Sequence, residues 1–213
     1  DLGERHLAVG IIDHEGNVGV RDRVVTPSKD RLSALTRLVQ RVLAATPAEQ
    51  RPILCAATGP GPVDEELGGF TPIGDNDWSG LPIRDSITEV VGCPTILEST
   101  GRAYALASSE GSSAIGLHLG DDVDGGVVVG GRLLQGERGS VGAFAHLAVD
   151  VEGRPCVCGK SGCLDSYASV RGIEATTGRG FVSTPSSLIT QSGMMVARAC
   201  ASLAAMMDIQ RIR

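Results

Sequence analysis

The sequence predicts a mixed α/β protein with two lobes. Short apolar runs typical of strands appear in both halves of the chain, and segments with apolar residues at helical spacing separate them. This order is typical of sheets covered by helices. A chain of 213 residues has room for two lobes, which we place at residues 1–110 and 111–213.

The first half of the chain opens with a predicted hairpin, followed by alternating helices and strands. We expect these elements in order: strands at 7–12 and 18–26 around a turn at 14–17, a helix at 29–46, a strand at 53–58, a helix at 82–92, and a strand at 94–100 leading into a helix from Gly101.

The second half begins with glycine-separated apolar runs. We expect three consecutive strands within 114–136, a short helix at 164–173, a flexible polar loop at 174–188 and a final helix at 189–207. The residues of that last helix expected to be buried are Ile189, Met194, Val196, Ala199, Leu203 and Met206.

Charge and hydropathy exclude several protein classes. The net charge is −6 and no Lys/Arg-rich run is present, so this segment is not expected to grip nucleic acid by itself. No apolar run approaches the length of a membrane-spanning helix, and the N-terminus does not resemble a signal peptide. Cys55, Cys93 and Cys200 are scattered in apolar surroundings, as expected of buried thiols in a reducing cytoplasm.

A compact set of metal-binding residues lies in the second half. His146, Cys156, Cys158 and Cys163 fall within eighteen residues, among several glycines. One imidazole and three thiolates make a complete tetrahedral set for structural zinc and leave no open position for a catalytic water. The alternative, three buried or disulfide-bonded cysteines, is less favoured because Cys156 and Cys158 are too close in sequence to pair easily.

The segment AHLAVDVEGRPCVCGKSGCLDSYAS resembles the zinc motif of the ROK family, which is named for repressors, open reading frames and sugar kinases. DLGERHLAVGIIDHEGNV, TGPGPVDEE, GDNDWSGLPIRDSITEVVGCPTILE and LHLGDDVDGGVVVGGRLLQGERGSVGAFAH resemble further family segments, so the resemblance covers residues 1–170 almost continuously. It implies an actin-like, ribonuclease-H-like, two-lobed ATPase-type fold with a structural zinc site and assembly into dimers or tetramers. Family members continue beyond the last helix, so we expect a C-terminal truncation.

The segments that resemble phosphate loops depart from the family pattern. The resemblance implies Asp-x-Gly-Gly-Thr at the start, where this chain has Glu4 and Arg5 after Asp1 and Gly3. The second loop is Gly-Thr-Gly-Val-Gly in family kinases, whereas the stretch at 120–124 here contains three aspartates. Added carboxylates repel a polyanion, so ATP binding is disfavoured. We expect the acidic stretch to be a solvated turn rather than a metal site, and Asp1 to be a solvated strand-edge acid.

The catalytic strand of family kinases ends in Glu-Asn-Asp, with the last residue as general base, whereas this chain has Glu98, Ser99 and Thr100. Threonine cannot accept a proton at neutral pH, so general-base assistance of roughly 10²–10⁴-fold is lost. Ala143 replaces a sugar-binding glutamate, and Asp165 stands where the family has a longer acid. Ser99, Thr100 and Asp165 remain candidate effector-binding residues, although Asp165 could equally answer a helix dipole.

These departures favour a non-catalytic transcriptional regulator body that binds an effector and oligomerises as a homodimer or tetramer. DNA would be contacted only through a winged-helix domain outside this chain, and a sugar-like effector in the interlobe cleft would shift the dimer geometry. The alternative is an ATP-dependent sugar kinase with divergent loops, and a third interpretation is a scaffolding pseudokinase without ligand. Zinc is the one cofactor expected, and no membrane partner is expected.

Overall fold

The computed structural model describes residues 1–73 and 77–213. The chain divides into two compact units, Asp1–Ser99 and Thr100–Arg213, called unit 1 and unit 2 below. The division falls before the helix from Thr100. That helix packs on strands of unit 2, which explains why it belongs there. Of the quoted segment at 74–98, residues 74–76 lie outside the described residues.

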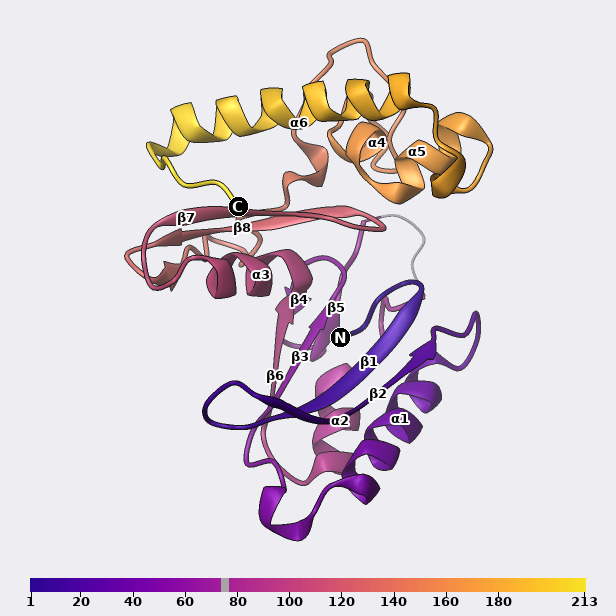
Figure 1. Cartoon of the computed structure of the whole chain (residues 1–213), viewed down its shortest axis with the longest axis vertical. Helices are drawn as coiled ribbons and strands as arrows, with labels where there is room; N and C mark the ends of the chain where they lie inside the picture. Colours follow the sequence, from indigo (N-terminus) through magenta and orange to yellow (C-terminus); the bar gives the residue numbers. More distant parts are fainter. Residues whose placement is uncertain (74–76) are drawn as a thin grey trace. The chain divides into compact units, whose positions relative to one another are not determined.

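In the part of unit 1 that the structure describes, residues 1–73 and 77–99, there are three small β pairs and two α-helices (Figure 1). Its elements are β1 (His6–Ile12), β2 (Val18–Val25), α1 (Arg31–Ala45), a 3-10 turn (Ala48–Gln50), β3 (Cys55–Gly59), β4 (Val63–Asp64), β5 (Gly69–Phe70), α2 (Ile83–Val91) and β6 (Thr95–Ser99). β1 and β2 are antiparallel, β3 and β6 are parallel, and β4 and β5 are antiparallel. The expected hairpin, helices and strands of the first half are therefore confirmed within a few residues.

The core of unit 1 is built by the apolar faces predicted from spacing. Leu35, Leu38 and Val39 of α1 pack against Leu7 of β1. Trp78 is fully buried in the same cluster, which also contains residues of α2. Gly92 ends α2 with φ +73°, a conformation that side chains with a Cβ rarely adopt.

Unit 2 contains one antiparallel sheet, several helices and the segment at 146–163 with the predicted metal ligands (Figure 1). Its elements are α3 (Thr100–Ser108), β7 (Ala114–Leu119), β8 (Val123–Val129), β9 (Arg132–Leu133), a 3-10 turn (Phe144–His146), α4 (Asp165–Ala168), α5 (Val170–Thr177), a second 3-10 turn (Phe181–Ser183) and α6 (Ser186–Met207). The three strands expected within 114–136 are present and pair in the order β7–β8–β9.

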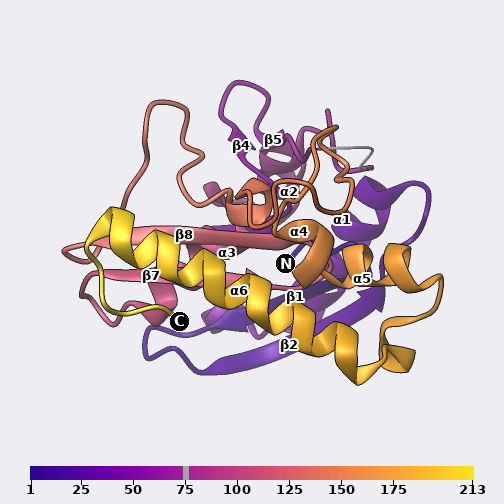
Figure 2. The same ribbon diagram turned by 90° about the horizontal axis from the view of Figure 1, so that it is seen from above.

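Glycines in β7 and β8 let α3 lie directly on the sheet. A Cβ on Gly116 would lie 2.4 Å from the Cα of Ala105, and one on Gly126 would lie 2.8 Å from the Cβ of Ala105. The opposite face is covered by α6, whose Leu203 packs with Ile115 and Val127 (Figures 1 and 2). The glycine-rich strands are therefore required by close helix packing.

Two expectations for the C-terminal region are wrong. The segment at 174–188 is mostly ordered, because α5 continues to Thr177, Gly178 caps it, and α6 already begins at Ser186. The expected helix at 164–173 is interrupted at Ser169, whose extended backbone and hydroxyl cap the N-terminus of α5.

The buried face of α6 agrees with the prediction at Ala199 and Leu203 but differs at other positions. Ile189, Met194 and Met206 are 45%, 53% and 69% exposed. The buried positions are Ser192, Met195, Ala199 and Leu203. These positions follow i, i+3, i+7 and i+11 spacing, so the apolar face is rotated from the expected one. Among the described residues, no helix is long and apolar enough to cross a bilayer.

Candidate functional site

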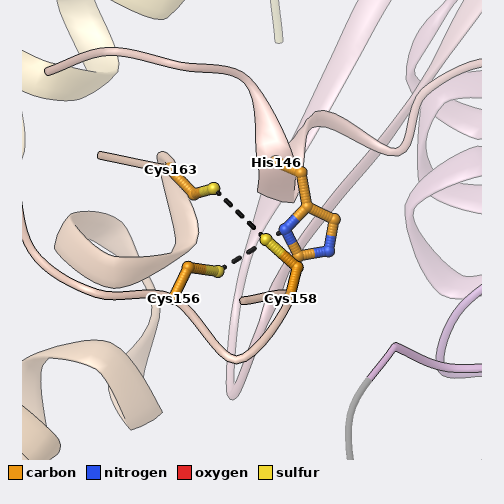
Figure 3. A group of neighbouring side chains, drawn as sticks. All are labelled: His146, Cys156, Cys158 and Cys163. Carbon is orange, nitrogen blue, oxygen red and sulfur yellow. Dashed lines mark hydrogen bonds between the residues drawn. The ribbon is translucent and has the colours of Figure 1, made fainter. Parts of the chain in front are cut away.

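The predicted metal ligands lie together in unit 2 (Figure 3). The ligand atoms of His146, Cys156, Cys158 and Cys163 all lie within 4.8 Å of one another. Cys156 Sγ is 3.6 Å from His146 Nδ1, and Cys158 Sγ is 3.6 Å from Cys163 Sγ. A tetrahedral site with Zn–S of about 2.3 Å and Zn–N of about 2.0 Å would separate its ligands by roughly 3.5–3.8 Å. The cluster therefore has the donor set of a tetrahedral metal site, and two of its ligand-atom distances match that geometry.

The segment at 146–163 folds into two nested antiparallel pairs that bring these ligands together. The outer pair joins Ala148 to Cys163, and the inner pair joins Pro155 to Ser161. Gly162 links the two pairs with φ +74°, and a Cβ there would lie 1.5 Å from the carbonyl oxygen of Asp150. Only glycine fits this position, so the turn that brings the cysteines together depends on Gly162.

Burial and mutual interaction shift the pKa values of the ligands. Burial lowers the pKa of His146, and the nearby charges of Arg171 and Lys160 add to this effect while Asp165 opposes it. A lowered pKa keeps the imidazole neutral near pH 7, as a metal ligand requires.

Two of the thiols shift in opposite directions. Burial first, and the other two thiols next, raise the pKa of Cys163 to about 12. Burial also acts to raise the pKa of Cys158, but hydrogen bonds from the Lys160 N–H and from neighbouring thiols lower it on balance. Metal binding must therefore displace at least the Cys163 proton.

The two hydroxyl residues proposed as effector contacts are consecutive in the chain. Ser99 is 2% exposed at the end of β6, and its N–H donates to Glu98 Oε1 at 2.9 Å. Thr100 is partly buried and opens α3. They form the junction between β6 and α3. Family kinases have a catalytic carboxylate at this place, and the sequence predicted that this chain lacks it. The side chains present there are hydroxyls.

Asp165 has a structural role in unit 2. Its carboxylate is buried; Oδ1 accepts the N–H of Val123 at 2.9 Å, and Oδ2 lies 3.4 Å from an Nη of Arg171. This residue begins α4 and so holds the helix against the start of β8. These contacts favour the structural alternative raised for Asp165.

The acidic stretch at 120–124 is tied to two helices. Asp124 Oδ2 accepts the N–H of Gly101 at 2.8 Å, and Oδ1 accepts the N–H of Gly125 at 2.8 Å. A Cβ on Gly101 would lie 2.1 Å from the Gly125 nitrogen, so α3 begins directly against this strand. The carbonyl of Gly120 accepts the N–H of Val170 at 2.9 Å. The turn was expected to be solvated, but these bonds show that Asp124 caps the positive end of α3.

In unit 1, Asp1 Oδ1 accepts the hydroxyl of Thr58 at 3.1 Å. The Asp1 carboxylate is thus tied to the end of β3.

Sequence reasoning missed a buried arginine. Arg102 is 3% exposed and donates to the carbonyls of Leu134 and Val141 at 2.9 and 3.1 Å and to Gln135 Oε1 at 2.8 Å. It thereby fastens the segment between β9 and the metal site to α3. The sequence signal that could have indicated it is a charged residue next to alanines, two positions after Thr100.

Comparisons with known proteins identify the family of this chain. The model of the ROK family matches residues 1–212. Glucokinase from Thermotoga maritima is 30% identical over 200 residues, covering 89% of this chain and 62% of that protein. The chain therefore spans less than two thirds of the length of this relative.

Two solved structures share the fold. The ROK hexokinase from Thermus thermophilus has a TM-score of 0.76 at 28% identity, covering 99% of this chain and 78% of that chain. A ROK family transcriptional regulator, a homologue of the E. coli Mlc protein, has a TM-score of 0.77 at 23% identity, covering 99% and 62%. The expected actin-like α/β fold is therefore confirmed. The kinases among these relatives support the sugar-kinase alternative more strongly than the regulator interpretation.

Proposed function

This chain belongs to the ROK family, and we propose that it is a sugar-recognising body that does not transfer phosphate. In this proposal it binds a sugar or a sugar-derived effector and assembles into a homodimer or tetramer as the core of a transcriptional regulator. DNA would be bound by a domain outside this chain, because a segment with a net charge of −6 and no basic run lacks the charge for phosphate contacts.

The observation that carries this proposal is the chemistry of the β6–α3 junction. Ser99 and Thr100 occupy it, and neither hydroxyl ionises near neutral pH. Without a general base, phosphoryl transfer to a sugar hydroxyl would lose roughly 10²–10⁴-fold in rate. Asp124 lies beside the junction, but each of its carboxylate oxygens accepts a backbone N–H. These hydrogen bonds support a capping role for Asp124 rather than proton transfer.

We further propose that the His146, Cys156, Cys158 and Cys163 cluster holds zinc. The donor set fits this metal, and a reducing cytoplasm would keep the three thiols available. A zinc ion held by four protein ligands supplies folding energy and rigidity rather than an activated water. The ligands themselves would fix the segment at 146–163 against α4, which starts two residues after Cys163.

The second candidate function is an ATP-dependent sugar kinase. It is favoured by the glucokinase relative at 30% identity and by the structural likeness to a ROK hexokinase. On this interpretation the altered loops would belong to a slow or unusually specific enzyme. The carboxylates at 121, 122 and 124 oppose it, because they repel the phosphates of ATP.

A single experiment separates the two candidates. Zinc-loaded protein, expressed with the complete gene, is titrated with glucose and with N-acetylmannosamine by calorimetry, with and without Mg-ATP. The same samples are tested for sugar-dependent ADP formation, with the Thermotoga maritima glucokinase as positive control. We expect sugar binding with ADP formation no greater than in the sugar-free sample. Sugar-dependent ADP formation with a matching yield of sugar phosphate would overturn the proposal and establish the kinase.

A further inference from the structure

A buried tyrosine hydroxyl lies inside the turn that joins the two pairs of the metal-binding segment. Tyr167, on α4, is 2% exposed. Its hydroxyl donates to Asp150 Oδ2 at 2.8 Å and accepts the N–H of Arg154 at 3.0 Å. A Cβ on Gly153 would lie 2.3 Å from the same hydroxyl oxygen, so the hydroxyl takes the space of a side chain at that position.

Arg154, two residues before Cys156, is held by the same helix and by α6. Its guanidinium lies 4.4 Å from the centroid of the Tyr167 ring. It donates to the carbonyl of Ser166 at 3.2 Å and to Gln191 Oε1 at 2.5 Å. Tyr167 thus contacts the approach to Cys156 both through its hydroxyl and through its ring.

The hydroxyl connects the two halves of the ligand set. Asp150 lies on the outer pair, next in space to the arm that carries Cys163, because its N–H donates to the carbonyl of Gly162 at 3.3 Å. Arg154 leads into the inner hairpin that carries Cys156 and Cys158, and its carbonyl accepts the N–H of Gly162 at 2.8 Å. The Tyr167 hydroxyl therefore bridges the two ligand-bearing pairs, with one hydrogen bond to each, beside the backbone hydrogen bonds that join them directly.

We propose that Tyr167 is the positioning residue of the metal site, and that its hydroxyl keeps the ligands in metal-binding geometry. This inference rests on the proposed zinc site. A metal gains full affinity only when its ligands are already placed, and partners beyond the ligands typically change affinity by about 10–100-fold. The hydroxyl is suited to this task because burial keeps water from replacing its two hydrogen bonds.

The test is the zinc affinity of Tyr167→Phe, which removes the hydroxyl and keeps the stacked ring. Tyr104→Phe is the matched control, since Tyr104 is the second of the two tyrosines and lies on α3, 40% exposed. Affinity is measured by competition with a chromophoric zinc chelator on the full-length protein. We expect a loss of about 10–100-fold for Tyr167→Phe and no change for Tyr104→Phe.

Gly153→Ala provides a second, independent readout. Its methyl group would lie 2.3 Å from the hydroxyl and 2.9 Å from Cβ and Cγ of Asp150. It should therefore weaken zinc binding in the wild type, and do so less in the Tyr167→Phe background, where the closest contact is gone and the contact with Asp150 remains. A merely structural tyrosine would destabilise the metal-free and zinc-bound forms equally, and zinc affinity would stay at the wild-type value. That outcome, with folded protein, overturns the inference. A wild-type protein that binds no zinc by metal analysis would instead refute the proposed zinc site.

Discussion

Removal of the Asp165 carboxylate distinguishes a structural acid from an effector contact. The carboxylate is buried, accepts the N–H of Val123 at 2.9 Å, and lies 3.4 Å from the guanidinium of Arg171. In Asp165→Ala the buried N–H would lose its charged acceptor, which costs about 1.5–3 kcal/mol. The Arg171 side chain is 34% exposed, so the ion pair adds no more than about 1 kcal/mol. The free energy of unfolding should therefore fall by about 3 kcal/mol.

Asp165→Asn is the matched variant, because it keeps the shape and one acceptor while it removes the charge. We expect a loss of about 1 kcal/mol from the weakened contact with Arg171. For a chain of 150–250 residues, 1 kcal/mol corresponds to about 2–4 °C in Tm, so the alanine variant should melt about 6–12 °C below the wild type.

The distribution of aromatic residues provides the assay. The single tryptophan, Trp78, lies in unit 1, whereas Tyr104 and Tyr167 both lie in unit 2. Near-ultraviolet circular dichroism of tyrosine, in excess zinc, reports on the unit that contains Asp165, and tryptophan fluorescence serves as the internal comparison. If Asp165→Ala leaves the tyrosine transition unchanged but abolishes glucose binding, the structural interpretation of Asp165 is refuted.

Three further predictions concern the metal site and the buried arginine. Gly162→Ala should reduce bound zinc well below one equivalent, because a methyl group cannot fit there. Gly159→Ala should cost only about 1–2 kcal/mol of stability, because Gly159 has a similar φ of +83° but no atom lies within 4 Å of its Cβ position. Equal zinc loss in both variants by metal analysis would contradict the steric argument. Apparent zinc affinity should rise with pH between about 6 and 8, because Cys163, whose pKa is raised to about 12, must lose a proton on binding. Chelator competition across this pH range checks the direction of the change in affinity. A flat profile would exclude proton release. Arg102→Met should destabilise unit 2 by about 3 kcal/mol or more, because the segment after β9 would lose its hydrogen bonds to the Arg102 guanidinium. Trypsin should then cleave faster after the exposed Arg138 in that segment. Unchanged cleavage would show that the segment is held by other contacts.

The local elements were largely predictable from spacing, and the exceptions have identifiable causes. Apolar spacing located α1 because one face of that helix is buried, and it located β7 and β8 because both are short apolar runs with α3 on one face and α6 on the other. The same reasoning found Ala199 and Leu203 on the buried face of α6 but wrongly added Ile189, Met194 and Met206, since apolar residues surround most of that helix and only packing selects one side. The predicted loop after α5 was mostly helical because Ser186 begins α6 three residues earlier than the apolar pattern indicated.

The candidate site divides in the same way. His146 and the three cysteines were identifiable from residue type and spacing, because a small loop with glycine at its turns can place them only near one another. Tyr167 and Arg102 were not identifiable, since their partners lie on segments whose approach depends on the fold.

The sequence by itself therefore determined the family and the α/β class, and it identified the His146, Cys156, Cys158 and Cys163 cluster that could hold a metal ion, because each depends on residue type over a short stretch. Only the tertiary structure gave the hydrogen-bond partners of the acids at 124 and 165. A carboxylate in water is compatible with binding a metal, a sugar or a helix end. These two carboxylates became helix and strand anchors because the N–H groups of Gly101 and Val123 were brought to them by folding.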